Sequence, residues 1–479
     1  MQDRLRSTGA RARACAVASL IVLGVAAFGG TAAAAALVPS PTVTGPIPAN
    51  APPGDPSHDY PQVATPLDLA RLGYVEEEYF FSGTANVYNT PALTTATVLS
   101  SGHPYKSRVI VRRPTSAAKF NGTVLVEWVN VTSGYNNDVM FRASQDHLIR
   151  AGYAYVGVSA QRIGVHGPAG LIAWSPARYG TLDVTDHGTV LNDGLSYDVF
   201  SQAAQAIRTP VGASILGGLP VQRVIAIGAS QSQGRLVTYH NSIHPIAGVF
   251  DGYVLYLGLG GTLRTDLGVK VFKVDTETDL LFLGEVAARQ ADSDHLRTWE
   301  VAGASHVAFS DFALRVFLVT RDSLPPPTPQ LCTQQPALSH TPAFHVLNAV
   351  YEHVSRWVTD GTPPPTAPRV NVLSAGPPVV VLERTSLGLS TGGIQLSQQA
   401  VPTAVDNGVN SGPGLCFLYG SHTPFDAATL SRLYPNHGSY VSAVSHLTND
   451  NLAAGYILPE DAQTDMQEAA QSDISKKSR

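Results

Sequence analysis

The chain has 479 residues, of which 44% are hydrophobic and 14% charged, and its formal net charge is −5. The hydrophobic fraction is sufficient for a large core, and the charged fraction is low for a soluble protein, which excludes general disorder. A slightly acidic chain has no basic surface of the kind that nucleic acids require, so no nucleic-acid partner is expected. The length fits two domains or one large α/β unit with insertions.

Residues 1–36 have the pattern of a secretory signal peptide. Arginines at positions 4, 6, 11 and 13 precede an uncharged run over 14–28, and the alanines at 32–36 offer cleavage sites. An uncleaved membrane anchor is the alternative interpretation, but the bulky apolar stretch is short for a membrane span. The sequence therefore predicts export to the periplasm or the medium, with no membrane attachment after cleavage.

Removal of the signal peptide would leave two cysteines, Cys332 and Cys416. In an exported chain a single pair of cysteines most simply forms a disulfide, although two buried free thiols are the alternative. The bond would tie the C-terminal residues 370–479 to the rest of the chain as a pocket wall. A loop of this length gives a crosslink a large entropic effect on the unfolded chain.

A series of strand-like runs begins at residue 74. The first two, 74–88 and 108–112, are expected to pair in antiparallel fashion. Six further apolar runs alternate with helix-like stretches, at 123–130, 153–158, 223–227, 248–257, 269–274 and 297–301. This alternation predicts an α/β fold with a doubly wound, mostly parallel eight-stranded sheet.

The predicted core spans 67–369 and is interrupted by one insertion, and two further segments lie before and after it. Residues 37–66 are rich in Pro and Ala and are predicted to be an extended linker. Residues 160–194 are predicted to be a lid-like insertion, and 370–479 a C-terminal extension packing on the core. The aromatic residues of the last two segments either line a pocket or form a small core of their own: Trp174, Tyr179, Phe417, Tyr419, Phe425 and Tyr434.

The sequence GASQSQGR at 228–235 directly follows the apolar strand 224–227. A serine on a tight strand-to-helix turn is exposed to a general base, and the next backbone N–H points at the developing oxyanion. Small residues two positions before and after the serine let such a turn close. Ser230, with Gly228 before it and Ser232 after it, is the predicted nucleophile. Ser232 is the alternative, but the strand ends too early for it.

An acidic turn follows the strand 269–274. A carboxylate placed there can orient a catalytic histidine and stabilise its protonated form. Asp275, Glu277 and Asp279 compete for this role. Asp279 is favoured, because the acid normally lies several residues beyond the strand, and Glu277 remains the alternative.

The strand 297–301 is followed by GASH at 303–306. His306 is therefore the predicted general base. The second donor of an oxyanion hole, beside the N–H of Gln231, is expected in the loop after the strand ending at 130. Asn130 marks this position, with the backbone of Val131 as the alternative. No metal-ligand spacing and no nucleotide-binding loop is found, so neither a metal nor another cofactor is expected.

The order Ser, Asp, His along the chain is that of α/β-hydrolases. The chain resembles the bacterial alpha/beta hydrolase domain family. The segments that carry this resemblance are VEWVNVT (126–132), GVSAQ (157–161), SYD (196–198), GASQSQGR (228–235), TETD (276–279), residues 357–364, GGIQL (392–396) and LYP (433–435). The resemblance implies a serine-dependent hydrolase with the α/β-hydrolase fold and fixes no substrate.

From these residues we expect a secreted enzyme that cleaves small-molecule carboxylic esters through an acyl-enzyme on Ser230. An acyltransferase that passes the same acyl group to an alcohol is one alternative. A non-catalytic binding protein with a hydrolase-like fold is the other.

Overall fold

The computed structural model describes residues 38–476. Residues 1–37 and 477–479 lie outside the described residues, and with them the predicted signal peptide. The main sheet has ten strands in the order β10-β9-β8-β7-β4-β5-β3-β2-β1-β6. The pairs within the run from β10 to β5 are parallel. The pairs β5–β3, β3–β2 and β2–β1 are antiparallel, and the short pair β1–β6 is parallel.

The strands are β1 (Thr42–Thr44), β2 (Tyr74–Asn89), β3 (Thr97–Pro114), β4 (Thr123–Trp128), β5 (Ala154–Val158), β6 (Val211–Gly212), β7 (Arg223–Ala229), β8 (Gly252–Tyr256), β9 (Lys270–Thr276) and β10 (Leu296–Val301). The mostly parallel α/β sheet is confirmed, with the eight predicted strands in it. The sheet also has β1 and β6, which extend the edge beyond β2. No strand was predicted at either place, because β1 has three residues, β6 has two, and neither forms an apolar run.

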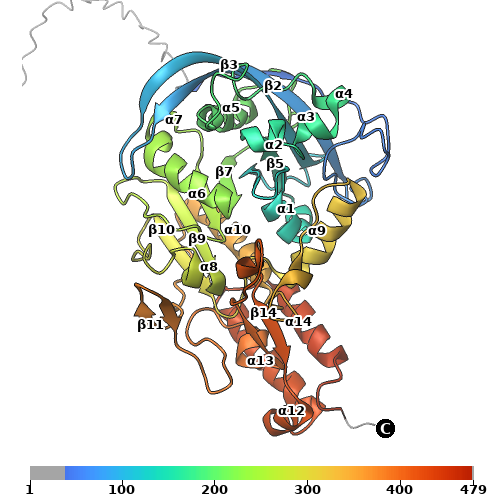
Figure 1. The fold of residues 1–479 in the computed structure, drawn as a ribbon, viewed down its shortest axis with the longest axis vertical. Helices are drawn as coiled ribbons and strands as arrows, with labels where there is room; N and C mark the ends of the chain where they lie inside the picture. Colours follow the sequence, from blue (N-terminus) through green and yellow to red (C-terminus); the bar gives the residue numbers. More distant parts are fainter. Residues whose placement is uncertain (1–37, 477–479) are drawn as a thin grey trace, which may run out of the picture. The chain divides into compact units, whose positions relative to one another are not determined.

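Both faces of the sheet are covered by helices. Along β4, Val124, Val126 and Trp128 pack into one apolar cluster, and Leu125 packs into the other. A strand covered on both faces is expected to be apolar throughout, as β4 is. One face carries α5 (Ser196–Arg208), α6 (Gln231–Thr238), the π-helix η1 (Tyr239–Ile243) and α7 (His244–Ala247), and the other carries α1 (Val139–Arg150) and α10 (Ala343–Asp360). In Figure 1 the long strands β2 and β3 arch over α5.

The segment predicted as a linker packs against the predicted insertion. Tyr60 and Val63 are buried beside Trp174 and Tyr179 in one apolar cluster. The insertion itself forms three short helices, α2 (Arg162–His166), α3 (Leu171–Trp174) and α4 (Pro176–Tyr179). The Pro-rich segment has no helical or strand periodicity. Its packing against the insertion depends on single side chains such as Tyr60 and could not be predicted from a sequence pattern.

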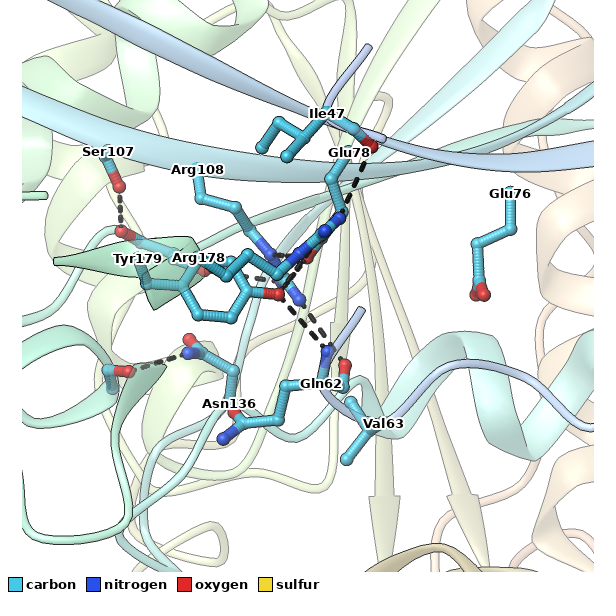
Figure 2. Close-up of polar contacts among 12 residues, drawn as sticks. Ile47, Gln62, Val63, Glu76, Glu78, Ser107, Arg108, Asn136, Arg178 and Tyr179 are labelled. Atoms are coloured by element: carbon cyan, nitrogen blue, oxygen red, sulfur yellow. Dashed lines mark hydrogen bonds and ion pairs between the residues drawn. The ribbon is translucent and has the colours of Figure 1, made fainter. Parts of the chain in front are cut away.

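A buried polar cluster holds these two segments against β2 (Figure 2). The carboxylate of Glu78 accepts hydrogen bonds from Arg108 Nε at 2.5 Å, Arg178 Nη2 at 2.6 Å and Tyr179 OH at 2.7 Å. Arg178 also donates to the backbone oxygens of Ile47 and Pro48. We call these four side chains, Glu78, Arg108, Arg178 and Tyr179, the Glu78 cluster. It connects the N-terminal segment, the insertion and the sheet.

The last part of the chain packs on the end of the sheet and on α10. After α9 (Phe309–Arg321) and the 3-10 helix η2 (Pro329–Leu331) come β11 (Val372–Ala375), β12 (Val380–Leu382), α11 (Ser397–Ala400), β13 (Ala404–Asn407), the 3-10 helix η3 (Cys416–Leu418), β14 (Ser421–Pro424), α12 (Ala427–Leu433), α13 (His437–Ala453) and α14 (Pro459–Gln471). A disulfide joins Cys332 to Cys416, whose Cα atoms are 5.3 Å apart. None of the helices between residues 38 and 476 is long and apolar enough to cross a membrane.

Candidate active site

Ser230 occupies the sharp turn between β7 and α6. Its φ is +60° and its ψ is −124°, in a region that non-glycine residues rarely adopt. Such strain is found most often at functional positions. A Cβ at Gly228 would come within 2.9 Å of Leu236 Cδ1 and within 3.2 Å of the Ser232 backbone, so the turn is closely packed there. The backbone thus has the geometry that the sequence motif predicts for a nucleophile turn.

The two serines of the motif have different surroundings. Ser230 lines a pocket together with His306. Ser232 lies inside α6, is fully buried, and its hydroxyl has no hydrogen-bond partner among the described residues. A hydroxyl buried in a helix cannot reach a substrate. The surroundings therefore favour Ser230 over Ser232.

Asp279 and His306 are hydrogen-bonded. His306 Nδ1 lies 2.6 Å from Asp279 Oδ1, and both side chains are buried. The second oxygen of Asp279 accepts from the backbone N and the hydroxyl of Thr276, which caps α8 (Glu277–Phe282). This capping box fixes the carboxylate in one orientation, so its other oxygen is aimed at the imidazole. In addition, the backbone N–H of His306 donates to the hydroxyl of Thr278.

The other two candidate acids have different partners. Glu277 accepts hydrogen bonds from Arg384 Nη2 at 2.5 Å, Ser390 Oγ at 2.7 Å and two backbone N–H groups. It thereby binds the C-terminal extension to the sheet. Asp275 lies 3.8 Å from Lys273 Nζ, and burial raises its pKa well above the usual value. Neither carboxylate is hydrogen-bonded to a histidine.

The predicted oxyanion donors differ in availability. The backbone N–H of Gln231, the first residue of α6, has no hydrogen bond to a described residue. The backbone N–H of Asn130 donates to Asn137 O at 3.1 Å, and its side-chain amide donates to Ala229 O. Val131 N–H makes no such bond within residues 38–476. Asn130 therefore shapes the loop, and Val131 is the better candidate for the second donor.

The pocket that holds Ser230 and His306 has a cavity volume of about 70 Å³. Its apolar lining comes from α1, the end of β8, the loop between β10 and α9, α10 and the region of η3. These residues are Val139, Ala143, Tyr256, Leu257, Val307, Ala308, Phe344, Leu415 and Leu418. None of the six aromatic residues named from the sequence lines it, and none of its lining residues comes from the insertion 160–194. The C-terminal extension does contribute a wall, through Leu415 and Leu418.

Several polar residues of the pocket had no signal in the sequence. Arg142 lies on α1, and Asp311 and Arg315 lie one turn apart on α9. Arg142 donates to both oxygens of Asp311, at 2.5 and 2.9 Å. The only available clue was that α9 directly follows the loop carrying His306. Which face of that helix meets the pocket depends on tertiary packing.

A buried carboxyl group lies on β4, against the start of α1. Glu127 accepts hydrogen bonds from the backbone N–H groups of Met140 and Phe141, in the first turn of α1, and from Tyr155 OH. Burial raises the pKa of Glu127 to about 8, with a further contribution from Asp138.

Among the residues that the structure describes, no group of three or more His, Cys, Asp or Glu is arranged to hold a metal ion.

The sequence matches the alpha/beta hydrolase domain family over residues 43–467. This is most of the chain, and the protein belongs to that family. A comparison with curated protein sequences found no match.

Solved structures with similar folds share little sequence with the chain. A dienelactone hydrolase from Anabaena variabilis is 16% identical, with a TM-score of 0.28, over 50% of this chain and 97% of that one. A serine hydrolase without a lid from Xanthomonas campestris is 12% identical, with a TM-score of 0.28, over 51% and 96%. A putative acetyl xylan esterase from Bacteroides fragilis is 13% identical, with a TM-score of 0.24, over 38% of this chain and only 44% of its own length.

Proposed function

We propose that the protein hydrolyses carboxylic esters through an acyl-enzyme. Ser230 Oγ attacks the ester carbonyl while His306 Nε2 accepts its proton, and Asp279 orients the imidazole and stabilises its cation. The N–H groups of Gln231 and Val131 bind the oxyanion. His306 then protonates the departing alcohol, and water activated by the same histidine releases the acid.

The observation that carries this proposal is the 2.6 Å hydrogen bond between Asp279 Oδ1 and His306 Nδ1, beside the pocket that Ser230 lines. The bond leaves Nε2 of the histidine as the nitrogen available to the pocket. The strained turn presents the serine hydroxyl to that pocket. These parts come from three separate loops at the carboxyl ends of β7, β9 and β10, where parallel α/β sheets place their sites.

The substrate in this proposal is a small ester acted on outside the cytoplasm. A cavity of about 70 Å³ favours short acyl or alcohol groups over long chains. The disulfide between Cys332 and Cys416 supports export, because such bonds persist mainly in oxidising compartments. The predicted signal peptide at 1–36 would direct that export.

An ester panel of increasing acyl length tests the proposal, with Ser230→Ala and Ser232→Ala as matched variants. We expect short esters to be hydrolysed, and Ser230→Ala to lower kcat by about 10⁴-fold or more, as loss of a triad serine does. Ser232→Ala removes a buried hydroxyl without a partner and should keep most of the activity. Full activity in Ser230→Ala would overturn the assignment. Product analysis with added alcohol separates hydrolysis from acyl transfer, and no turnover of any ester would support a binding protein.

A further inference from the structure

Arg315 is a buried cation in the pocket with no acidic partner of its own. Its side chain lines the same pocket as Ser230 and His306, and the residue is 7% exposed. Nη2 donates to Ser133 Oγ at 2.7 Å, and Nε donates to Tyr135 OH at 3.3 Å. Within residues 38–476, no carboxylate oxygen lies within 4.0 Å of it. Both of its partners are neutral hydroxyl groups.

The nearest acid on its own helix is already occupied. Asp311 lies one turn before Arg315 and also lines the pocket, but both of its oxygens accept from Arg142. Asp138, the next acid, pairs with Arg112 and Arg142. Since both oxygens of Asp311 are paired with Arg142, this pocket carboxylate does not compensate the charge of Arg315.

A buried guanidinium is costly unless a carboxylate or phosphate compensates its charge. The hydroxyl groups of Ser133 and Tyr135 fix the position of the Arg315 side chain, but they supply no negative charge. Its third nitrogen, Nη1, makes no hydrogen bond to any described residue and is not among the fully buried atoms. A planar guanidinium held in place with a free donor is suited to binding a carboxylate.

We propose that Arg315 is the anchor of a carboxylate subsite in the catalytic pocket, so that the preferred substrates are esters that also carry a free carboxylate. This inference rests on the proposed ester hydrolysis and deepens it by naming the substrate class. The carboxylate takes the place of the missing acidic partner, and it binds Nη1 while Ser133 and Tyr135 hold the rest of the group. Because Arg315 and Ser230 line the same pocket, the ester and the carboxylate belong to one small molecule.

The test compares matched esters on the purified full chain. One substrate of each pair is the monomethyl ester of a dicarboxylic acid with three to six carbons, which carries a free carboxylate. Its neutral partner is the methyl ester in which a methyl group replaces that carboxylate. A second pair of esters places the carboxylate on the alcohol part of the substrate: acetyl esters of short hydroxy acids are compared with acetyl esters of the corresponding alcohols. We expect the best anionic ester to exceed its neutral counterpart at least 10-fold in kcat/KM, since hydrogen bonds to charged groups typically contribute about 10- to 100-fold.

Arg315→Met should abolish the preference for anionic over neutral esters. Arg315→Lys should keep part of it, because lysine retains the positive charge but lacks the planar guanidinium group. Arg356→Met is the control, since it removes an exposed arginine of α10 and leaves the pocket unchanged. Melting temperatures of all variants establish that they fold. If Arg315→Met proves unstable, the ratio of kcat/KM for the anionic and the neutral ester is measured in Arg315→Lys instead, and a lower ratio than in the wild type supports the subsite. An unchanged ratio of anionic to neutral esters in the folded Arg315 variants would overturn the inference.

A binding measurement separates this inference from the proposed function. Calorimetry with Ser230→Ala and the best anionic ester should show binding that weakens at least 10-fold when Arg315→Met is added. If the wild type hydrolyses neutral esters and prefers no anionic one, the subsite is wrong and the esterase proposal stands. If no ester is hydrolysed but the anionic esters bind through Arg315, the esterase proposal fails and the subsite stands.

Discussion

The Glu78 cluster and the pocket around Ser230 are both buried and both charged, but their charges are compensated differently. In the Glu78 cluster each oxygen of the single carboxylate accepts from an arginine, and Tyr179 OH lies within 2.9 Å of both (Figure 2). In the pocket, Nη1 of Arg315 has no hydrogen bond to a described residue. The N–H groups of Gln231 and Val131, the residues that follow the pocket residues Ser230 and Asn130, have none either.

The difference indicates which buried polar groups serve the fold and which serve a ligand. A satisfied network stabilises one arrangement of the chain, because each polar group would be costly without its partner. Unsatisfied donors facing a cavity cost stability and are retained where a ligand supplies the missing acceptor. On this comparison, substitutions in the Glu78 cluster should affect unfolding, and substitutions in the pocket should affect turnover.

The largest effect is expected from Asp279→Asn. The amide cannot hold the imidazole in the required tautomer or stabilise its cation, so kcat should fall about 10³- to 10⁴-fold. Steady-state kinetics on a short ester measure this. Glu277→Gln is the matched control in the same turn, because Glu277 binds Arg384 and Ser390 instead of His306. Glu277→Gln should lower the melting temperature and leave kcat within a few-fold of the wild type. A larger loss of kcat in Glu277→Gln than in Asp279→Asn would transfer the catalytic role to Glu277.

Glu78→Gln should give the second largest effect, on stability. It leaves the two guanidinium groups of Arg108 and Arg178 without their shared carboxylate, and breaking a buried ion pair typically costs about 3–5 kcal/mol. Urea unfolding measures the loss. At a temperature where the variant is folded, its kcat should stay within a few-fold of the wild type. A loss of kcat as large as that of Asp279→Asn, without loss of stability, would contradict the structural role of the cluster.

The effect expected at Glu127 is the smallest over any one pH unit, and it depends on pH. The pKa of its carboxyl is about 8 in the folded protein and near 4.5 in the unfolded chain. Between these values the folded state binds more protons than the unfolded state, so stability falls as pH rises through this window, by at most about 1.4 kcal/mol per pH unit. Glu127→Gln should flatten the unfolding free energy between pH 5 and 8. An unchanged slope would show that Glu127 titrates normally.

The sequence predicted the elements that carry the candidate site better than the surroundings of that site. Ser230, Asp279 and His306 each follow an apolar strand, and the carboxyl ends of parallel strands lie along one edge of a sheet. Their convergence could therefore be expected from strand order alone. The choice between Asp279 and Glu277 had no such basis, because it depends on which carboxylate the C-terminal extension binds.

Features that depend on tertiary packing were not predictable. Arg315 lies on a helix whose orientation toward the pocket is set by its contacts with other parts of the chain, and no motif marks it. Trp174 and Tyr179 were open to two interpretations, and the structure buries them against the N-terminal segment. Both cases involve contacts between segments far apart in the sequence, which periodicity and local motifs do not encode.

Labelling with a fluorophosphonate probe tests the central claim most directly, because the probe reacts with a serine only when a base and an oxyanion site activate it. We expect one covalent adduct per chain, mapped by peptide mass spectrometry to Ser230. The adduct should be lost in Ser230→Ala and kept in Ser232→Ala, and its rate of formation should fall strongly in Asp279→Asn. An adduct on Ser232, or no adduct on a folded wild-type chain, would contradict the account.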